Sequence, residues 1–156
     1  MADGQALVRY LAENEEDVYE ALTKLNWIFS NRSPQHDHRW SGPIIDPGNG
    51  CSPMTIRSFY PLRAFPDMEE KDIPRAYRAV RRFHQLTADP RFQIRYTMQE
   101  GEVIVMDNRR ILHGREAFSP DGRRHFRGCY VDQDEVHSCL RVLDRHLETQ
   151  SRTLLE

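Results

Sequence analysis

Short apolar segments separated by turn residues, without a regular alternation of strand and helix, are the feature that most constrains this chain. Alternating or continuously apolar runs predict strands, and these lie at 26–31, 43–45, 54–62, 92–98, 102–108 and 124–132. The run at 102–108 is apolar on both faces, which predicts a buried strand. The segment 33–53, rich in proline and glycine, predicts a loop around the short strand at 43–45.

Helices are expected at both ends of the chain and once in the middle. Apolar residues at three- and four-residue spacing predict helices at 6–12, 17–25, 70–86 and 134–148. The middle helix is the clearest, with an arginine-rich side opposite an apolar stripe and Pro74 in its first turn. The pattern favours an α+β fold that is mainly antiparallel, a partial double-stranded β-helix or jelly roll with flanking helices.

Composition excludes several classes of protein. The net charge of −2 over 156 residues provides no bulk attraction to nucleic acid or to an anionic membrane, and no apolar run is long enough to span a bilayer. Three cysteines without CxxC spacing argue against a disulfide framework or a zinc ribbon. A reducing, cytoplasmic compartment is the expectation, with a mitochondrial one left open if a targeting segment precedes Met1.

Two segments carry candidate chemistry. His113 ends an apolar run in "DNRRILHGREAF", where it is either a metal ligand or a hydrogen-bonded turn histidine. In the predicted strand 124–132, period two places Arg124, Phe126, Gly128 and Tyr130 on one face. A guanidinium, a gap at glycine and a phenol ring make a plausible pocket wall, because the guanidinium fork can hold a carboxylate. The alternative is a surface strand with an ordinary ion pair.

The blocks "DNRRILHGREAF" and "GRRHFRGCYVDQDEVHSCLRVL" are similar to the C-terminal end of the γ-butyrobetaine and trimethyllysine dioxygenases. These belong to the taurine dioxygenase-like group of Fe(II)/2-oxoglutarate oxygenases. The resemblance implies that His113 is a metal ligand and that Arg124 anchors the cosubstrate 2-oxoglutarate. It further implies that Tyr130 contributes to a substrate site for a quaternary ammonium group.

The family's other two iron ligands form a His-x-Asp or His-x-Glu motif upstream of these blocks. Of the seven histidines here, His146 alone has a carboxylate two positions on, Glu148, and that pair falls on the last predicted helix. Residues two apart on a helix point about 200° apart and cannot share one ion. In "HDH", His36 and His38 are an alternative pair of ligands, or part of a solvated loop.

These observations predict that residues 1–156 form the C-terminal part of a single dioxygenase domain, without its His-x-Asp segment. The expected reaction is hydroxylation of a small carboxylate, with a γ-butyrobetaine-like quaternary ammonium compound as one option. The rival hypothesis is a non-catalytic, degenerate domain that binds a small carboxylate or a partner chain. No nucleic-acid or membrane partner is expected, and a homodimer is left open.

Overall fold

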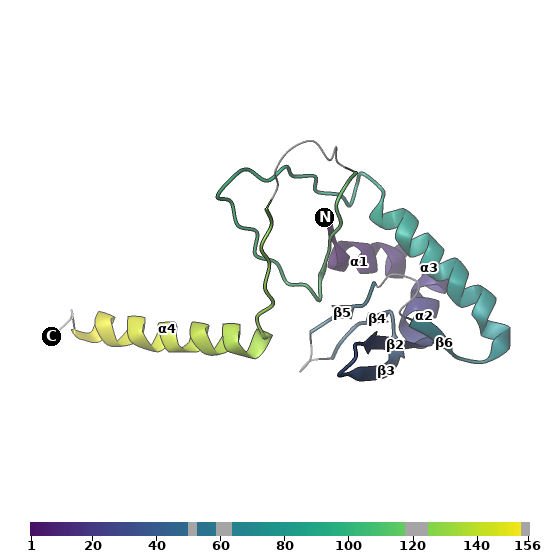
Figure 1. The fold of residues 1–156 in the computed structure, drawn as a ribbon, viewed down its shortest axis with the longest axis horizontal. Coiled ribbons are helices and arrows are strands. Elements are labelled where there is room, and N and C mark those ends of the chain that lie inside the picture. The colour runs from purple at the N-terminus through teal and green to yellow at the C-terminus, as the bar shows by residue number, and fades with distance from the viewer. Residues whose placement is uncertain (50–52, 59–63, 118–124, 154–156) are drawn as a thin grey trace. The chain divides into compact units, whose positions relative to one another are not determined.

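A computed structural model describes residues 1–49, 53–58, 64–117 and 125–153 (Figure 1). The chain divides into two units, Met1–Glu116 and Ala117–Glu156, and each is described by itself. The first unit contains all the strands and three α-helices of the described residues, and the second contains one long helix.

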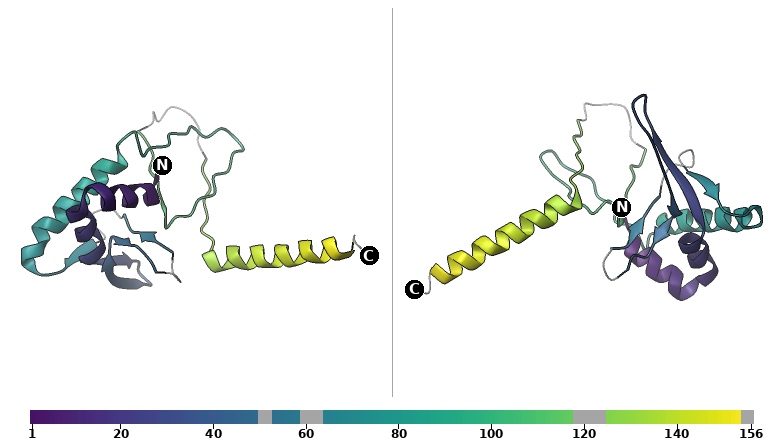
Figure 2. Two further views of the ribbon diagram at one scale, coloured as in Figure 1. Left: turned by 180° about the vertical axis from the view of Figure 1, so that it is seen from behind. Right: turned by 90° about the horizontal axis from the view of Figure 1, so that it is seen from below.

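The predicted helices are confirmed. In the first unit they are α1 (Gly4–Asn14), α2 (Glu16–Lys24) and α3 (Ile73–Thr87), and a short 3-10 turn, η2 (Glu70–Asp72), precedes α3. The Asp3 carboxylate caps α1 by accepting a hydrogen bond from the Gln5 backbone N–H at 3.0 Å. Helices α2 and α3 lie alongside each other, as the views of Figure 2 show.

All the strand pairs of the described residues are antiparallel, as predicted. The largest sheet has the order β3-β2-β6 and is built from β2 (Asn26–Arg32), β3 (Asp37–Pro43) and β6 (Ala64–Asp67). Two smaller pairs join β4 (Ile45–Asp46) to β5 (Thr55–Ile56) and β1 (Ala2–Asp3) to β7 (Ile111–Leu112). Helix content and antiparallel sheet are thus established, whereas the described strands form three separate small sheets and do not close into a jelly roll.

The prediction of a loop at 33–53 is wrong for residues 37–43. Residues 37–43 form β3, which pairs along its length with β2. The Trp40 ring stacks on the Phe29 ring opposite it, with 5.1 Å between centroids, and this cross-strand contact offsets the unfavourable local composition. Strand β6 was not predicted at all, because its four residues include Pro66.

Three predicted strands are not formed. Residues 102–108 and 125–132 have no regular structure, and 92–98 contributes a single bridge, from Gln93 to Ala2. The prediction that 102–108 is buried is wrong, because Val103 is 82% exposed and Val105 is 92% exposed. A strand needs a neighbour for its backbone hydrogen bonds. The described residues provide none for 102–108 and 125–132, and for 92–98 they provide only the contact with Met1 and Ala2.

The core of the first unit lies between its helices and the sheets. Its largest fully buried side chains are Phe83, Leu7, Leu11, Leu22, Ile45 and Leu86. Ion pairs connect α2 and the Glu15 residue directly before it to α3. The Arg82 guanidinium donates two hydrogen bonds to Glu15, at 2.6 and 2.8 Å, and lowers the pKa of that carboxyl.

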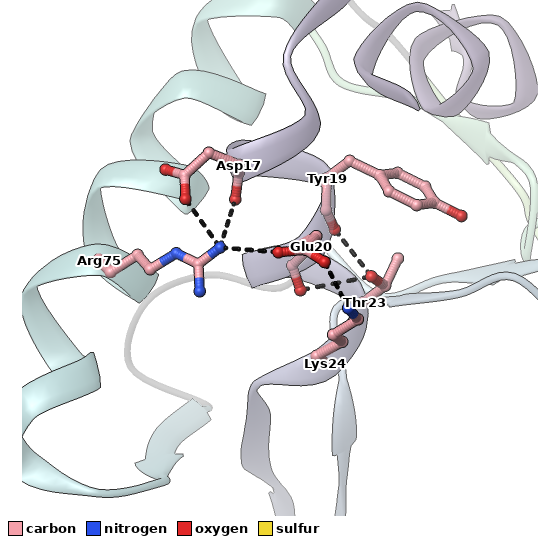
Figure 3. Close-up of polar contacts among 6 residues, drawn as sticks. All are labelled: Asp17, Tyr19, Glu20, Thr23, Lys24 and Arg75. Atoms are coloured by element: carbon pink, nitrogen blue, oxygen red, sulfur yellow. Dashed lines mark hydrogen bonds and ion pairs between the residues drawn. The ribbon is translucent and has the colours of Figure 1, made fainter. Parts of the chain in front are cut away.

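A second contact between the same helices centres on Arg75. Its guanidinium reaches the Asp17 side chain at 2.8 Å and the Glu20 side chain at 3.4 Å, and Glu20 also pairs with Lys24 (Figure 3). Partly exposed pairs of this kind contribute little individually, so their main effect is to fix how α2 and α3 align.

Phe83→Ala should lower the free energy of unfolding by about 3–5 kcal/mol, because it leaves a cavity among fully buried side chains. The matched control is Phe65→Ala, since Phe65 is an exposed phenylalanine of β6, and it should cost about 1 kcal/mol or less. Urea unfolding followed by circular dichroism measures both. Equal losses for the two variants would contradict this placement of the core.

Candidate functional site

His113 immediately follows β7, the last strand of the first unit. In the β1–β7 pair, Ala2 lies opposite Leu112 and Asp3 lies opposite Ile111. The same stretch makes two further backbone hydrogen bonds, from Gly4 N–H to the Arg110 carbonyl at 3.0 Å and from Ile56 N–H to the Arg109 carbonyl at 2.8 Å. The backbone before His113 is therefore hydrogen-bonded both to the N-terminal segment Ala2–Gly4 and to Ile56 of β5.

An ion pair between Asp3 and Arg110 reinforces this attachment. The Arg110 guanidinium donates to both Asp3 carboxylate oxygens, at 2.8 and 2.6 Å, across 107 residues of sequence. Hydrogen bonds from Arg110 lower the pKa of the Asp3 carboxyl, against the opposing effect of partial burial. The same carboxylate raises the pKa of Arg110. Asp3 thus serves both as the cap of α1 and as the ion-pair partner that holds the segment before His113.

Gly4 allows the close approach of these segments. A Cβ atom at this position would lie 2.3 Å from Ile56 Cδ1 and 2.5 Å from the Arg110 carbonyl oxygen. Neither the Arg110 backbone nor the buried Ile56 side chain can move far enough to relieve this overlap. Any larger residue at position 4 would therefore push α1 away from the strand that leads to His113.

The His113 side chain itself is exposed. Its Nδ1 atom lies 3.4 Å from the Ile111 carbonyl oxygen, which is too long for a strong hydrogen bond. Within the described parts of the chain, no three His, Cys, Asp or Glu side chains gather closely enough to hold a metal ion. His113 is thus a single available imidazole donor at the end of a fixed strand.

The other predicted site residues lie elsewhere. Arg124 is outside the described residues. Tyr130 belongs to the second unit, is 86% exposed and lies in an irregular segment just before α4 (Gln133–Thr153), so the predicted strand face around it is not formed.

The alternative histidine pair lies in the β2–β3 hairpin, with His36 in the turn and His38 in β3. The His36 and His38 rings stack with 5.3 Å between centroids, and both side chains are exposed. The carboxylate between them, Asp37, accepts hydrogen bonds from Arg39 and has its pKa lowered by that contact. With Asp37 engaged by arginine, the hairpin offers two imidazoles and no carboxylate donor.

Comparison with known proteins identifies the family. The family model described as "Taurine catabolism dioxygenase TauD, TfdA family" matches residues 1–130. The chain belongs to this family of dioxygenases. The match begins at β1 and runs through His113, Arg124 and Tyr130.

Relatives with assigned names agree with the family. The chain is 38% identical over 144 residues to the γ-butyrobetaine dioxygenase of Pseudomonas sp. (strain AK-1), which covers 92% of this chain and 38% of that protein. It is 26% identical over 152 residues to the mitochondrial trimethyllysine dioxygenase of Mus musculus, which covers 94% of this chain and 36% of that protein. The chain therefore spans somewhat more than a third of the length of these relatives.

None of the described helices combines the length and apolar character needed to cross a bilayer.

Two residues that position the candidate ligand were not singled out from the sequence, Asp3 and Arg110. They lie at opposite ends of the first unit's sequence, and their pairing follows only from the register of β1 with β7. The local signal that was available is the aspartate directly before a helix, which is typical of a helix cap.

Substitutions at Asp3 can separate its two roles. Asp3→Asn keeps a capping side chain but loses the ion pair, and it should cost up to about 1 kcal/mol. Asp3→Ala loses both the cap and the ion pair, and it should lower the free energy of unfolding by about 1–2 kcal/mol relative to the unaltered chain. Thermal unfolding at pH 7 measures the difference.

The stabilisation provided by the ion pair between Asp3 and Arg110 should decrease as the pH falls. Because folding lowers the Asp3 pKa below its ordinary value of 3.8, the ion pair stabilises the folded chain above that pH. This contribution disappears as the pH falls through the lowered value, so the unaltered chain and Asp3→Asn should converge in stability in acid. A gap that persists or widens in acid would contradict the assignment.

Proposed function

We propose that this chain is the C-terminal part of an Fe(II)/2-oxoglutarate-dependent dioxygenase domain that hydroxylates a small carboxylate. The family match over residues 1–130 carries the proposal. The names of the relatives, γ-butyrobetaine dioxygenase and trimethyllysine dioxygenase, favour a substrate that bears a quaternary ammonium group. Cys129 and Cys139 are free and exposed thiols, which is compatible with a reducing, cytoplasmic compartment.

The donor set of the described residues does not fit iron by itself. A facial site for Fe(II) requires two histidines and one carboxylate, and the described residues contain no such group. His113 supplies one imidazole at the end of a strand that is anchored on both sides. We assign the other two donors, and the strands that would complete a jelly roll with 92–98, 102–108 and 124–132, to polypeptide that precedes residue 1 in a longer protein.

Two further residues are assigned by their place in the matched region. Arg124 would bind the far carboxylate of 2-oxoglutarate, because a guanidinium holds a carboxylate with two parallel hydrogen bonds. Tyr130 would present its ring face to the cationic end of the substrate, an attraction worth roughly 0.5–2 kcal/mol per contact. Its exposure leaves that ring face available in the described chain.

The alternative is a domain without catalysis that binds a small carboxylate or a partner chain. One observation favours it, namely that the described residues present a single metal-binding imidazole at the candidate site. Under this hypothesis Arg124 would still bind a carboxylate, whereas His113 would have no measurable role.

A chimera distinguishes the two functions. Residues 1–156 replace the matched segment of the Pseudomonas γ-butyrobetaine dioxygenase, and succinate formation is measured with Fe(II), 2-oxoglutarate and γ-butyrobetaine. We expect turnover that His113→Ala abolishes and that the control His84→Ala, on the exposed side of α3, retains. A folded, monodisperse chimera that forms no succinate, and whose iron content is unchanged by His113→Ala, would support the non-catalytic alternative.

The isolated chain should bind Fe(II) no more tightly than its His113→Ala variant, because one imidazole holds this ion weakly. It should also form no succinate from 2-oxoglutarate. Anaerobic titration with Fe(II), followed by a succinate assay, tests both statements. A stoichiometric site that His113→Ala removes would contradict the prediction, and His36 and His38 would then be the first residues to substitute.

In the chimera, Arg124→Ala should raise the 2-oxoglutarate concentration needed for half-maximal rate by about 10- to 100-fold, the effect of losing a charge-assisted bidentate contact. Arg127→Ala is the matched control, because the Arg127 guanidinium contacts His125 at 3.1 Å and has no assigned role in the site. An unchanged requirement in Arg124→Ala would remove this residue from the cosubstrate site.

A further inference from the structure

Arg57, which directly follows β5, is a largely buried arginine whose donor groups are not all used. Its side chain is 22% exposed, and its Nη1 atom is buried without a hydrogen-bond acceptor among the described residues. The Asp46 carboxylate pairs with it only loosely, because Asp46 Oδ2 lies 4.0 Å from Nη1, beyond hydrogen-bond distance. A buried donor without an acceptor lowers stability, so this guanidinium is suited to a ligand that supplies one.

The ring of Trp40 holds the Arg57 guanidinium in place. Arg57 Cζ lies 3.8 Å from the centroid of that ring, at a distance typical of a cation–π contact. The ring is itself fixed, because it stacks on Phe29 and lies across Gly42, where a Cβ atom would be 2.6 Å from Trp40 Cζ2. Stacking occupies a face of the guanidinium and leaves its edge, where the N–H groups point, for an acceptor.

The charges around Arg57 favour an anion. Burial lowers the pKa of the Arg57 guanidinium, Asp46 opposes that effect, and the positive charge of Arg109 adds to it. Arg109 is brought near by the backbone, since the Ile56 N–H donates to the Arg109 carbonyl at 2.8 Å. Two guanidinium groups and one carboxylate leave a single positive charge at this place, which matches a singly charged ligand.

We propose that Arg57, held on the ring of Trp40, binds the carboxylate of a small molecule. The guanidinium edge carries parallel N–H groups whose spacing fits the two oxygens of a carboxylate. A doubly charged oxyanion such as sulfate fits less well, because Asp46 repels it more strongly and it loses more hydration on binding. The site uses neither His113 nor Arg124, so it is separate from the proposed iron and 2-oxoglutarate positions and its test does not depend on them.

Tryptophan fluorescence of the complete 156-residue chain tests the site, because Trp40 lies against the guanidinium. The chain has two tryptophans, and a Trp27→Phe background leaves Trp40 as the single reporter. Acetate, titrated against chloride at constant ionic strength, should change the Trp40 emission saturably, and sulfate should bind more weakly than acetate. A change that does not saturate, or sulfate that binds as tightly as acetate, would overturn the proposal.

Substitutions in the same background identify the groups responsible. Arg57→Met keeps a long side chain against Trp40 but removes the guanidinium, and it should weaken acetate binding by about 10-fold or more. Arg39→Met is the matched control, since Arg39 is an exposed arginine of β3 that pairs with Asp37, and it should leave acetate binding unchanged.

Asp46→Asn supplies a second test that leaves Arg57 intact and therefore holds even if Arg57→Met does not fold. Asparagine keeps the oxygen that accepts a hydrogen bond from the Gly48 N–H at 3.0 Å, and it removes the negative charge beside Nη1. Acetate binding should become tighter in this variant. Weaker or unaltered binding in Asp46→Asn, or unaltered binding in Arg57→Met, would show that Arg57 does not hold the carboxylate.

Discussion

A strand requires a neighbour for its backbone hydrogen bonds, and this requirement decides which parts of the chain form sheet. The two residues of β7 are ordered because β1, at the other end of the first unit's sequence, pairs with them. Residues 103–106 alternate between exposed and partly covered side chains, as a strand would, yet the described residues supply no partner strand. Val103 and Val105 consequently face solvent, although their chemistry suits a buried sheet.

The same requirement explains the state of the candidate site. Asp3, Gly4 and Arg110 make contacts within the first unit that fix the backbone leading to His113. The position from which the His113 side chain projects is therefore defined. A metal ligand also needs other donors at fixed distances, and those would come from neighbouring strands in a jelly roll. The ligand position and the missing strand partners are therefore two aspects of one proposal, in which further polypeptide completes both the sheet and the donor set.

The sequence predicted the helices well because their signals are local. Apolar spacing, an acidic first turn in α2 and Pro74 near the start of α3 all act within a few residues. Strands depend on distant partners, which local patterns do not identify. Residues 37–43 form a strand in which Trp40 stacks on Phe29, although their composition predicts a loop. Residues 102–106 form no strand, although their valines are typical of one. The role predicted for His113 came from resemblance to a family, whereas Asp3 and Arg110 became visible only through the register of β1 with β7.

Hydrogen exchange at the backbone amides of 103–106 tests most directly whether this segment forms a strand only when further polypeptide supplies a partner. In the isolated chain these amides should exchange nearly as fast as in an unstructured peptide, while those in the middle of α3 are protected. In the chimera with the Pseudomonas relative, the same amides should become protected to a degree similar to α3. Strong protection of 103–106 in the isolated chain, or none in a folded and active chimera, would contradict the account.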